Sequence, residues 1–426
     1  RGFHPGKPAR PGGVRRPVAA AVQRGAPAPA PAGSGAAGRP VQPGVRAARP
    51  PVRPAGLTAL AAGRCSGGCF MVYWGKLSPK KRFTAWRRGM KKRICILYTG
   101  GTIGMVPTDR GYAPKPGALA QYLKAIPDLA SPEAPAWELV EMEPLLDSSN
   151  ITVREWRAIG QAIFDHYDRF DGFVVLHGTD TMAYTASALS FMLENLQKPV
   201  IFTGSQIPLC RMRSDGRDNL ITSLLIAAQG RAAEVCLYFG GKLLRGNRAT
   251  KRSADGLEAF YSPNWPPLAT AGVNIQYDAG ALAKPKATGE LTLAAFEPVP
   301  IGVLKVFPGI QFELFESILT ERLRGIVLET FGAGNIPDNG KSTLLPLIQR
   351  AYKNGTVLTV CSQCAQGSVH LGTYATSAAL KDAGAVSGQD MTTEAAVAKL
   401  YYLFSKGYEL EEIKRKVEEN LMGEIS

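Results

Sequence analysis

The chain has 426 residues, of which 45% are hydrophobic, and its formal net charge is +15. The charge is concentrated in residues 1–89, which hold 17 of the 50 Lys and Arg and none of the 35 Asp and Glu. From Met90 onward, 33 basic residues face 35 acidic ones, so the net charge of this part is −2. Because the chain from Met90 onward is nearly neutral, its charge argues against nucleic acid or a membrane surface as its partner.

Residues 1–89 are rich in Pro, Gly, Ala and Arg, as in "AAVQRGAPAPAPAGSGAAGRPVQPG", and lack the apolar periodicity that a folded core requires. We predict that this leader is disordered. An Arg-rich, acid-free leader is typical of a transit peptide or of a basic arm that binds nucleic acid. We favour a third interpretation, in which these residues precede the natural start and the functional chain begins at Met90.

The 337 residues from Met90 onward are too many for one hydrophobic core and about right for two domains. Along them one unit recurs in kind: a short apolar run, a Gly-containing loop and then a helical pattern. Such runs indicate strands that are buried on both faces of a parallel sheet. They are "RICILYTGG" at 93–101, "GFVVLHGTDT" at 172–181, "PVIFTGSQIP" at 199–208, "EVCLYFGGKL" at 234–243, "GIVLETFGAGN" at 325–335 and "TVLTVCSQC" at 356–364.

Helical patterns separate these runs. Thr152 and Glu155 have the spacing of a capping box, and apolar residues then recur on one face of the following segment. Because strands and helices alternate, we predict an α/β fold: a doubly wound, mostly parallel sheet in a large N-terminal domain, and a smaller C-terminal α/β domain. We place the N-terminal domain at residues 90–275, the linker at 276–298 and the C-terminal domain at 299–426.

Neither membrane insertion nor metal or disulfide chemistry is expected. No apolar run approaches the roughly 18 residues of a spanning helix. The seven cysteines form no regular framework, which predicts a reducing, cytoplasmic setting. Cys361 and Cys364 form a C-x-x-C, but residues 90–426 offer no second pair of metal ligands with such spacing, so we expect no metal site.

Two loops that follow predicted strands carry most of the candidate chemistry, "TGGT" at 99–102 and "HGTDT" at 177–181. The ligand crevice of an open α/β sheet lies beyond the carboxyl ends of its strands, so neighbouring strands would bring Thr102 and Thr179 to one pocket. Other interpretations fit each loop taken alone. The first can hold a phosphate or form a simple turn, although it matches neither G-x-G-x-x-G nor a P-loop, and the second can supply helix N-cap residues.

Several uncommon motifs occur in order: "YTGGTIGM" followed by Gly111-Tyr112, "LLDSSN", "LHGTDTMAYTASALSFML", "FTGSQIP", "RSDGRDNL" and "LLRGNRATK". From Met90 to the C-terminus the chain resembles the bacterial-type L-asparaginase family, and most of all its cytoplasmic (type I) branch. The resemblance implies hydrolysis of L-asparagine to L-aspartate and ammonia by a threonine nucleophile through an acyl-enzyme, without a cofactor. A threonine hydroxyl is a weak nucleophile, so it needs a proton relay and donors for the oxyanion.

The resemblance also implies the catalytic roles. Thr102 is the nucleophile, and Tyr112 closes over the site as a proton-handling partner. Lys251 takes or relays a proton through Thr179, and Asp180 holds the α-ammonium group of the substrate. Both threonines follow predicted strands, so the residues alone do not choose between them. We assign the attack to Thr102 because its flanking glycines leave that loop unencumbered.

The remaining site residues are expected to bind the substrate and the oxyanion. By the same resemblance, Asp147, Ser148 and Ser149 match the loop that grips the α-amino and α-carboxylate ends of the substrate. Backbone N–H groups near Gly101 and Thr179 would form the oxyanion site. Taken alone, the two serines can equally form the entry to the next helix.

Some cytoplasmic members of this family carry a second asparagine pocket that activates the enzyme, formed by an arginine and a cysteine. Cys364 matches the cysteine, but Glu329 stands at the position of the arginine. A carboxylate does not pair with the α-carboxylate of a ligand as arginine does. We therefore predict weak or absent cooperativity.

Two other functions are kept as alternatives. An archaeal branch of the family is the ammonia-releasing subunit of a tRNA amidotransferase and carries an extra folded N-terminal domain, whereas residues 1–89 show no strand pattern. A non-catalytic amino-acid binding protein would keep the pocket but lack the nucleophile, and Thr102 is present. The family resemblance further implies a homo-oligomer, a dimer or tetramer.

Overall fold

The computed structural model describes residues 91–283, 289–337 and 343–426. The leader predicted at 1–89 lies outside these residues, and so do five residues of the linker predicted at 276–298. The predicted domain boundaries stay predictions. Within the described ranges, none of the helices has the length and apolar character needed to cross a membrane.

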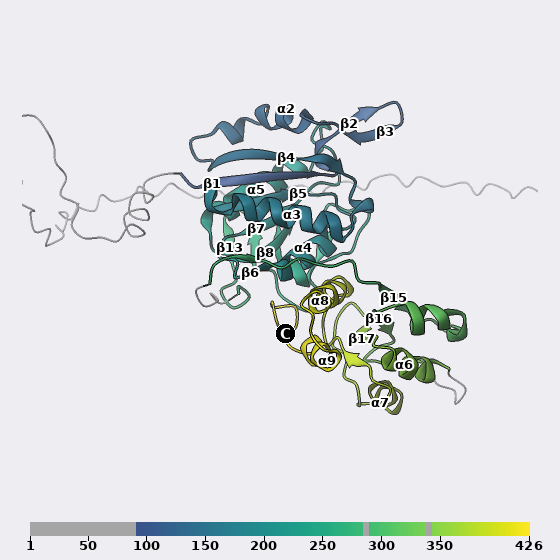
Figure 1. Cartoon of the computed structure of the whole chain (residues 1–426). Helices are drawn as coiled ribbons and strands as arrows, with labels where there is room; N and C mark the ends of the chain where they lie inside the picture. Colours follow the sequence, from purple (N-terminus) through teal and green to yellow (C-terminus); the bar gives the residue numbers. More distant parts are fainter. Residues whose placement is uncertain (1–90, 284–288, 338–342) are drawn as a thin grey trace, which may run out of the picture. The chain divides into compact units, whose positions relative to one another are not determined.

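An eight-stranded sheet forms the larger part of the structure, in the order β13-β12-β9-β8-β7-β5-β1-β4. Five neighbouring strands are parallel, and Figure 1 shows them side by side: β4 (Ala136–Leu146), β1 (Arg93–Gly100), β5 (Gly172–Leu176), β7 (Val200–Thr203) and β8 (Val235–Phe239). Antiparallel strands complete it: β9 (Lys242–Arg245), β12 (Ala269–Ala271) and β13 (Ile275–Tyr277). The prediction of a mostly parallel α/β sheet is confirmed.

Successive side chains of the parallel strands lie in two different hydrophobic clusters, one on each face of the sheet. Cys95 and Leu97 belong to one buried cluster, whereas Ile94 and Ile96 belong to another. Side chains alternate between the two faces of a strand, so an apolar run of this kind is stable only where helices cover both faces. The covering helices are α3 (Val153–His166) and α4 (Met182–Met192) on one face, and α2 (Ala118–Lys124) and α5 (Gly216–Gln229) on the other.

The predicted capping box starts α3. Thr152 Oγ1 accepts a hydrogen bond from the N–H of Arg154, and Glu155 Oε2 accepts one from the N–H of Thr152 at 2.9 Å. Two N–H groups that have no partner inside the helix are thereby satisfied. The helix begins at Val153, one residue after its cap.

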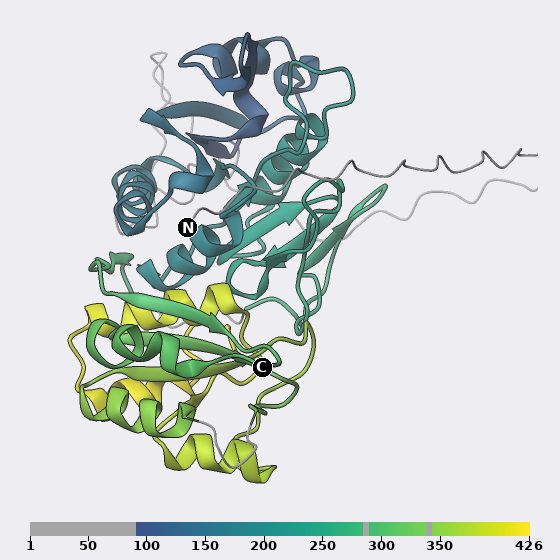
Figure 2. The same cartoon turned by 90° about the vertical axis from the view of Figure 1, so that its right-hand side faces the viewer.

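A second sheet follows, with four parallel strands in the order β15-β16-β17-β18. Helices lie on both of its sides in Figure 2. The strands are β15 (Ile301–Lys305), β16 (Gly325–Thr330), β17 (Val357–Ser362) and β18 (Val386–Ser387). The helices are α6 (Leu344–Lys353), α7 (Ala375–Asp382), α8 (Thr393–Ser405) and α9 (Leu410–Val417). This is the predicted smaller α/β domain.

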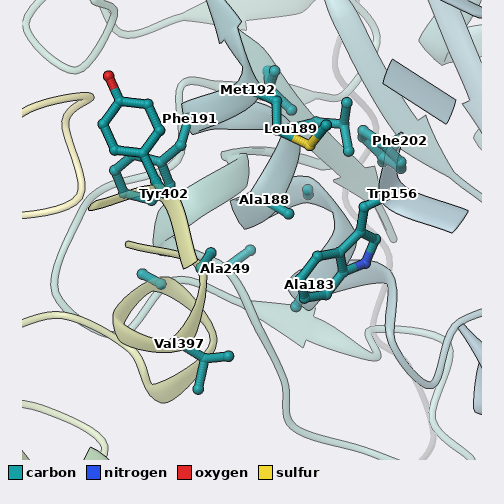
Figure 3. Close-up of a cluster of buried hydrophobic side chains, with 14 of the residues drawn as sticks. Trp156, Ala183, Ala188, Leu189, Phe191, Met192, Phe202, Ala249, Val397 and Tyr402 are labelled. Carbon is teal, nitrogen blue, oxygen red and sulfur yellow. The ribbon is translucent and has the colours of Figure 1, made fainter. Parts of the chain in front are cut away.

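Helix α4 is buried on nearly all sides because it lies between the large sheet and α8. One apolar cluster contains Phe202 of the large sheet, Leu189 of α4 and Val397 of α8, as Figure 3 shows. The rings of Phe191 and Tyr402 stack at 5.5 Å between centroids. The described part of the chain therefore has a continuous core that runs from one sheet to the other.

Three short strand pairs complete the structure. They are β2 (Met105–Thr108) with β3 (Gly111–Pro114), β10 (Thr250–Lys251) with β11 (Phe260–Tyr261), and β6 (Leu193–Glu194) with β14 (Thr292–Leu293). The first is a hairpin that carries Tyr112, and the second carries Lys251.

Arg248 links the segment before β10 to the chain around the smaller sheet. Its side chain is only 1% exposed, and its Nη2 lies 2.9 Å from Asp390 Oδ2. Burial raises the pKa of Asp390, but hydrogen bonds from Arg248 and Ser426 outweigh that effect and hold the pKa below its ordinary value. Arg248 Nη1 also donates to the carbonyl of Glu424 at 2.7 Å.

Removal of the Arg248 charge should destabilise the fold strongly. In Arg248→Met the carboxylate of Asp390 stays buried without its cation, and we expect the free energy of unfolding to fall by about 3 to 5 kcal/mol. Urea unfolding followed by circular dichroism measures the loss. Arg415→Met is the matched control, because Arg415 and Glu419 form an exposed pair and should cost less than about 1 kcal/mol. Equal losses would contradict the structural role of Arg248.

Candidate active site

The candidate site lies at the carboxyl ends of three neighbouring parallel strands, β4, β1 and β5. The chain passes from β1 to β4 on one side and then to β5 on the other, so the sheet order changes direction at β1. In open α/β sheets, ligands bind at such a switch point, beyond the carboxyl ends of the strands. The three loops there begin at Gly101, Asp147 and His177.

Glycines bring the three loops into backbone contact. A Cβ on Gly101 would lie 2.4 Å from the nitrogen of Gly178, and a Cβ on Gly178 would lie 2.4 Å from Ser148 Oγ. A Cβ on Gly100 would lie 2.1 Å from the carbonyl oxygen of Leu146. Gly101 also has φ of 86°, a conformation that L side chains rarely adopt. The glycines of "TGGT" and "HGTDT" therefore allow the loops to meet.

Thr102 opens a short 3-10 turn, η2 (Thr102–Gly104), immediately after this contact. Its side chain is half-buried. In the part of the chain that the structure describes, the Thr102 hydroxyl makes no hydrogen bond, and neither Gly101 N–H nor Thr179 N–H donates one. A hydroxyl and two amide donors are thus available to a ligand beside the loop contact.

Thr179 and Lys251 form the other half of the site. Lys251 Nζ donates to Thr179 Oγ1 at 3.0 Å and to Asp180 Oδ1 at 2.8 Å, and Thr179 Oγ1 donates to Gln206 Oε1 at 3.1 Å. Lys251 is about 20% exposed and Asp180 about 65%, so the carboxylate remains open to solvent beside the cation. The structure brings Thr179, Asp180 and Lys251 together.

The loop after β4 carries Asp147, Ser148 and Ser149. Asp147 caps the short turn η4 (Ser148–Asn150), and its Oδ1 accepts a hydrogen bond from the N–H of Ser149 at 3.1 Å. Ser148 is buried, and its carbonyl accepts from Thr181 Oγ1 at 2.7 Å. Asp147 and Ser149 are exposed. Of the three, they are the residues whose side chains a ligand can reach from solvent.

Tyr112 lies on β3, which contacts the turn that carries Thr102. It lies on the β2–β3 hairpin with 42% of its surface exposed, and its hydroxyl accepts a hydrogen bond from Arg211 Nη1 at 3.0 Å. Within the described ranges, no hydrogen bond joins Tyr112 to Thr102, Thr179 or Lys251. The Tyr112 hydroxyl is held by Arg211 rather than by a group of the site.

Comparison with known proteins identifies the family. Residues 93–282 match the family model "Asparaginase, N-terminal", and residues 300–416 match "Glutaminase/Asparaginase C-terminal domain". The chain is 47% identical to L-asparaginase 1 of Escherichia coli K12 over 336 residues, which cover 79% of this chain and 98% of that protein. The chain belongs to the asparaginase family.

Two further relatives differ in how similar they are to this asparaginase. The crystal structure of L-asparaginase I from Vibrio cholerae superposes with a TM-score of 0.73 at 46% identity, covering 79% of this chain and 99% of that one. A glutamyl-tRNA(Gln) amidotransferase subunit of Pyrococcus horikoshii is 33% identical over 82% of this chain and 81% of that protein. The amidotransferase protein is thus the more distant of the two.

Glu329 and Cys364 of this asparaginase line a cavity of about 200 Å³, together with Thr250 and Glu394. Glu329 Oε1 accepts a hydrogen bond from Thr393 Oγ1 at 2.6 Å, and Lys305 Nζ lies 3.7 Å from its Oε2. The carboxylate therefore already faces a cation of its own chain. The predicted weakness of cooperativity stays a prediction.

The C-x-x-C does not form a matched pair of reactive thiols. Cys361 is buried whereas Cys364 is exposed, and burial raises the pKa of Cys361 to about 12. A thiol with such a pKa is a poor nucleophile and a poor metal ligand at neutral pH. The described residues contain no group of three or more His, Cys, Asp or Glu that could hold a metal ion.

Sequence reasoning missed Gln206 and His177. Gln206 Oε1 accepts from Thr179 Oγ1, and its Nε2 donates to the carbonyls of Ala254 and Gly256 at 3.1 and 3.2 Å. The available signal was its position in "FTGSQIP", the loop after the next parallel strand. His177 lies in the motif "HGTDT", but the sequence pattern predicts no role for its side chain.

The loop contact can be tested at Gly101. Gly101→Ala would force a Cβ against the backbone nitrogen of Gly178, and neither backbone can move cheaply. A displacement of about 1 Å should reduce kcat/KM for L-asparagine by about 100-fold. The measurement is steady-state ammonia release. Gly407→Ala is the control, since Gly407 also has positive φ, 69°, but its added Cβ meets nothing within 4 Å. Equal activity in both variants would contradict the contact.

Proposed function

We propose that the chain hydrolyses L-asparagine to L-aspartate and ammonia, with Thr102 as the nucleophile. Family membership and 47% identity to E. coli L-asparaginase 1 support the activity. The observation that carries the assignment of Thr102 is the Gly101–Gly178 backbone contact, which lies between the Thr102 loop and the loop of Thr179. Thr179 in turn accepts a hydrogen bond from Lys251.

In the proposed reaction, Thr102 Oγ1 attacks the side-chain amide carbon of the substrate, and its proton passes through the proton-transfer groups of the site to the amide nitrogen. The resulting oxyanion accepts hydrogen bonds from Gly101 N–H and Thr179 N–H, which have no partner in the described chain. Protonation of the amide nitrogen lets ammonia leave, and an ester between Thr102 and the aspartyl group remains. Water hydrolyses this ester, which releases L-aspartate and restores the hydroxyl.

Substrate recognition is assigned to the exposed polar groups around the loops. Asp180 would hold the α-ammonium group, since its carboxylate is exposed and only one of its oxygens pairs with Lys251. Asp147, Ser148 and Ser149 would hold the α-amino and α-carboxylate ends. Hydrogen bonds to charged groups are the strong ones, so a few such contacts suffice to orient a small amino acid.

Proton transfer is assigned to Lys251, Thr179 and Tyr112. In the structure the Thr179 hydroxyl donates to Gln206, and Lys251 donates to Thr179. Relay of a proton to or from Lys251 therefore requires the hydroxyl to turn away from Gln206. Tyr112 would join after closure of its hairpin, which would also exclude water from acylation.

The alternatives have less support. Identity to the P. horikoshii amidotransferase protein is 33%, against 47% for the E. coli asparaginase, and residues 90–426 carry a net charge of −2. A non-catalytic binding protein would not need an unengaged threonine hydroxyl at the loop contact. Assembly as a homodimer or homotetramer and a cytoplasmic location remain part of the proposal.

Loss of the nucleophile should abolish turnover. We expect Thr102→Ala to release ammonia from L-asparagine at less than about one-thousandth of the wild-type rate, with an unchanged circular dichroism spectrum. Thr102→Ser keeps a hydroxyl at this position and should retain measurable turnover. Wild-type rates in Thr102→Ala would show that another residue attacks.

Loss of the amine at Lys251 should slow acylation. Lys251→Met removes the hydrogen-bond donor to Thr179, and we expect the first-turnover rate to fall by about 100-fold or more, in the range of general acid–base catalysis. Rapid-quench measurement of ammonia reports that rate. Lys251→Arg keeps the charge but does not deprotonate, and should be nearly as slow. Lys242→Met, at an exposed ion pair with Glu258, is the control; a rate for Lys251→Met equal to that control would remove Lys251 from the mechanism.

A further inference from the structure

His177 is fully buried at the end of β5, beside the loop contact. Its backbone N–H donates to the carbonyl of Thr203 at 2.9 Å, and its Nδ1 lies 2.7 Å from the carbonyl oxygen of Gly178. Its Nε2 is buried and has no hydrogen-bond partner in the described part of the chain. The ring packs edge-on against Phe202 at 5.9 Å between centroids.

These contacts determine the tautomer of His177. A carbonyl oxygen only accepts, so Nδ1 carries the hydrogen and donates it to Gly178, and Nε2 keeps a bare lone pair. Burial lowers the pKa of His177 to about 4, so the ring stays neutral throughout the physiological range. The hydrogen bond to Gly178 therefore persists without titration.

The bond acts on the peptide that joins Gly178 to Thr179. A peptide unit is planar and almost always trans, so its C=O and N–H point in opposite directions. A donor that holds the carbonyl of Gly178 thereby sets the direction of Thr179 N–H. We propose that His177 is a positioning residue that aims Thr179 N–H at the oxyanion, an inference that rests on the reaction proposed above.

The unpartnered Nε2 distinguishes this role from simple packing. An apolar side chain of similar size would fill the space next to Phe202 without burying a polar atom that lacks a partner. The hydrogen bond that Nδ1 donates to Gly178 explains why an imidazole is buried here. This bond holds the peptide whose N–H, that of Thr179, makes no hydrogen bond in the described structure.

A matched pair of variants tests the proposal. His177→Asn places an amide N–H at the branch position of Nδ1, whereas His177→Leu has the same branching without a donor. We expect His177→Leu to lower kcat for L-asparagine by about 10- to 100-fold, approaching the loss seen when an oxyanion donor is removed. KM should change by less than about 3-fold, because the oxyanion forms only in the transition state. His177→Asn should recover most of kcat.

A control variant, a replacement variant and the wild-type activity separate the outcomes. Thr356→Val removes another buried hydrogen bond, to the carbonyl of Leu323 at 2.7 Å in the smaller sheet region, and should leave kcat unchanged at similar thermal stability. If His177→Leu does not fold, His177→Gln serves as the non-donor variant. Its side-chain amide lies one methylene too far from the backbone to occupy the position of Nδ1. An active wild type with equal kcat in the donor and non-donor variants overturns the role of His177. An inactive wild type instead overturns the proposed reaction.

Discussion

The Gly101–Gly178 contact is the constraint on which the candidate site depends. Strands β1 and β5 are neighbours, but the loops beyond them could diverge. They stay together because neither residue has a Cβ where the two backbones meet. The contact accounts for glycines beside threonine in both loops: glycine supplies the close approach, and threonine supplies the hydroxyl. It also leaves the amide groups of Gly101 and Thr179 without internal partners, which makes them available to a developing negative charge.

The position of Lys251 depends on a second constraint, which is a set of contacts with residues far along the chain. The segment before it is held by polar side chains that reach residues 421–426. Arg248 donates to the carbonyl of Glu424, and Asn247 donates to the carbonyl of Met422 at 3.0 Å. Lys251 itself lies on a strand of only two residues, which has little stability of its own. The position of its amine beside Thr179 is therefore set by buried contacts with a segment about 175 residues away.

Periodicity and capping made part of the structure predictable from the sequence, whereas several contacts between distant loops were missed. Apolar runs predicted the parallel sheet because residues such as Ile94 and Cys95 are buried on opposite faces. The spacing of Thr152 and Glu155 predicted the start of α3. No local pattern shows that Gln206 receives the hydroxyl of Thr179, or that Tyr112 lies against Arg211. Those contacts depend on how loops from distant parts of the chain converge.

The site contains one group of side chains that are hydrogen-bonded to one another and a second group that has no hydrogen-bond partners in the described chain. Thr179, Lys251 and Gln206 are hydrogen-bonded to one another, and only the Thr179 hydroxyl has to turn for the proposed proton relay. The Thr102 hydroxyl and the two loop amides have no such partners in the described chain. Donors held rigidly but left unpaired need little reorganisation when charge appears on a bound carbonyl, and this pre-organisation is the main source of electrostatic catalysis. The groups that lack partners are therefore those that the proposed attack and oxyanion stabilisation use, whereas proton transfer uses the partnered groups Thr179 and Lys251.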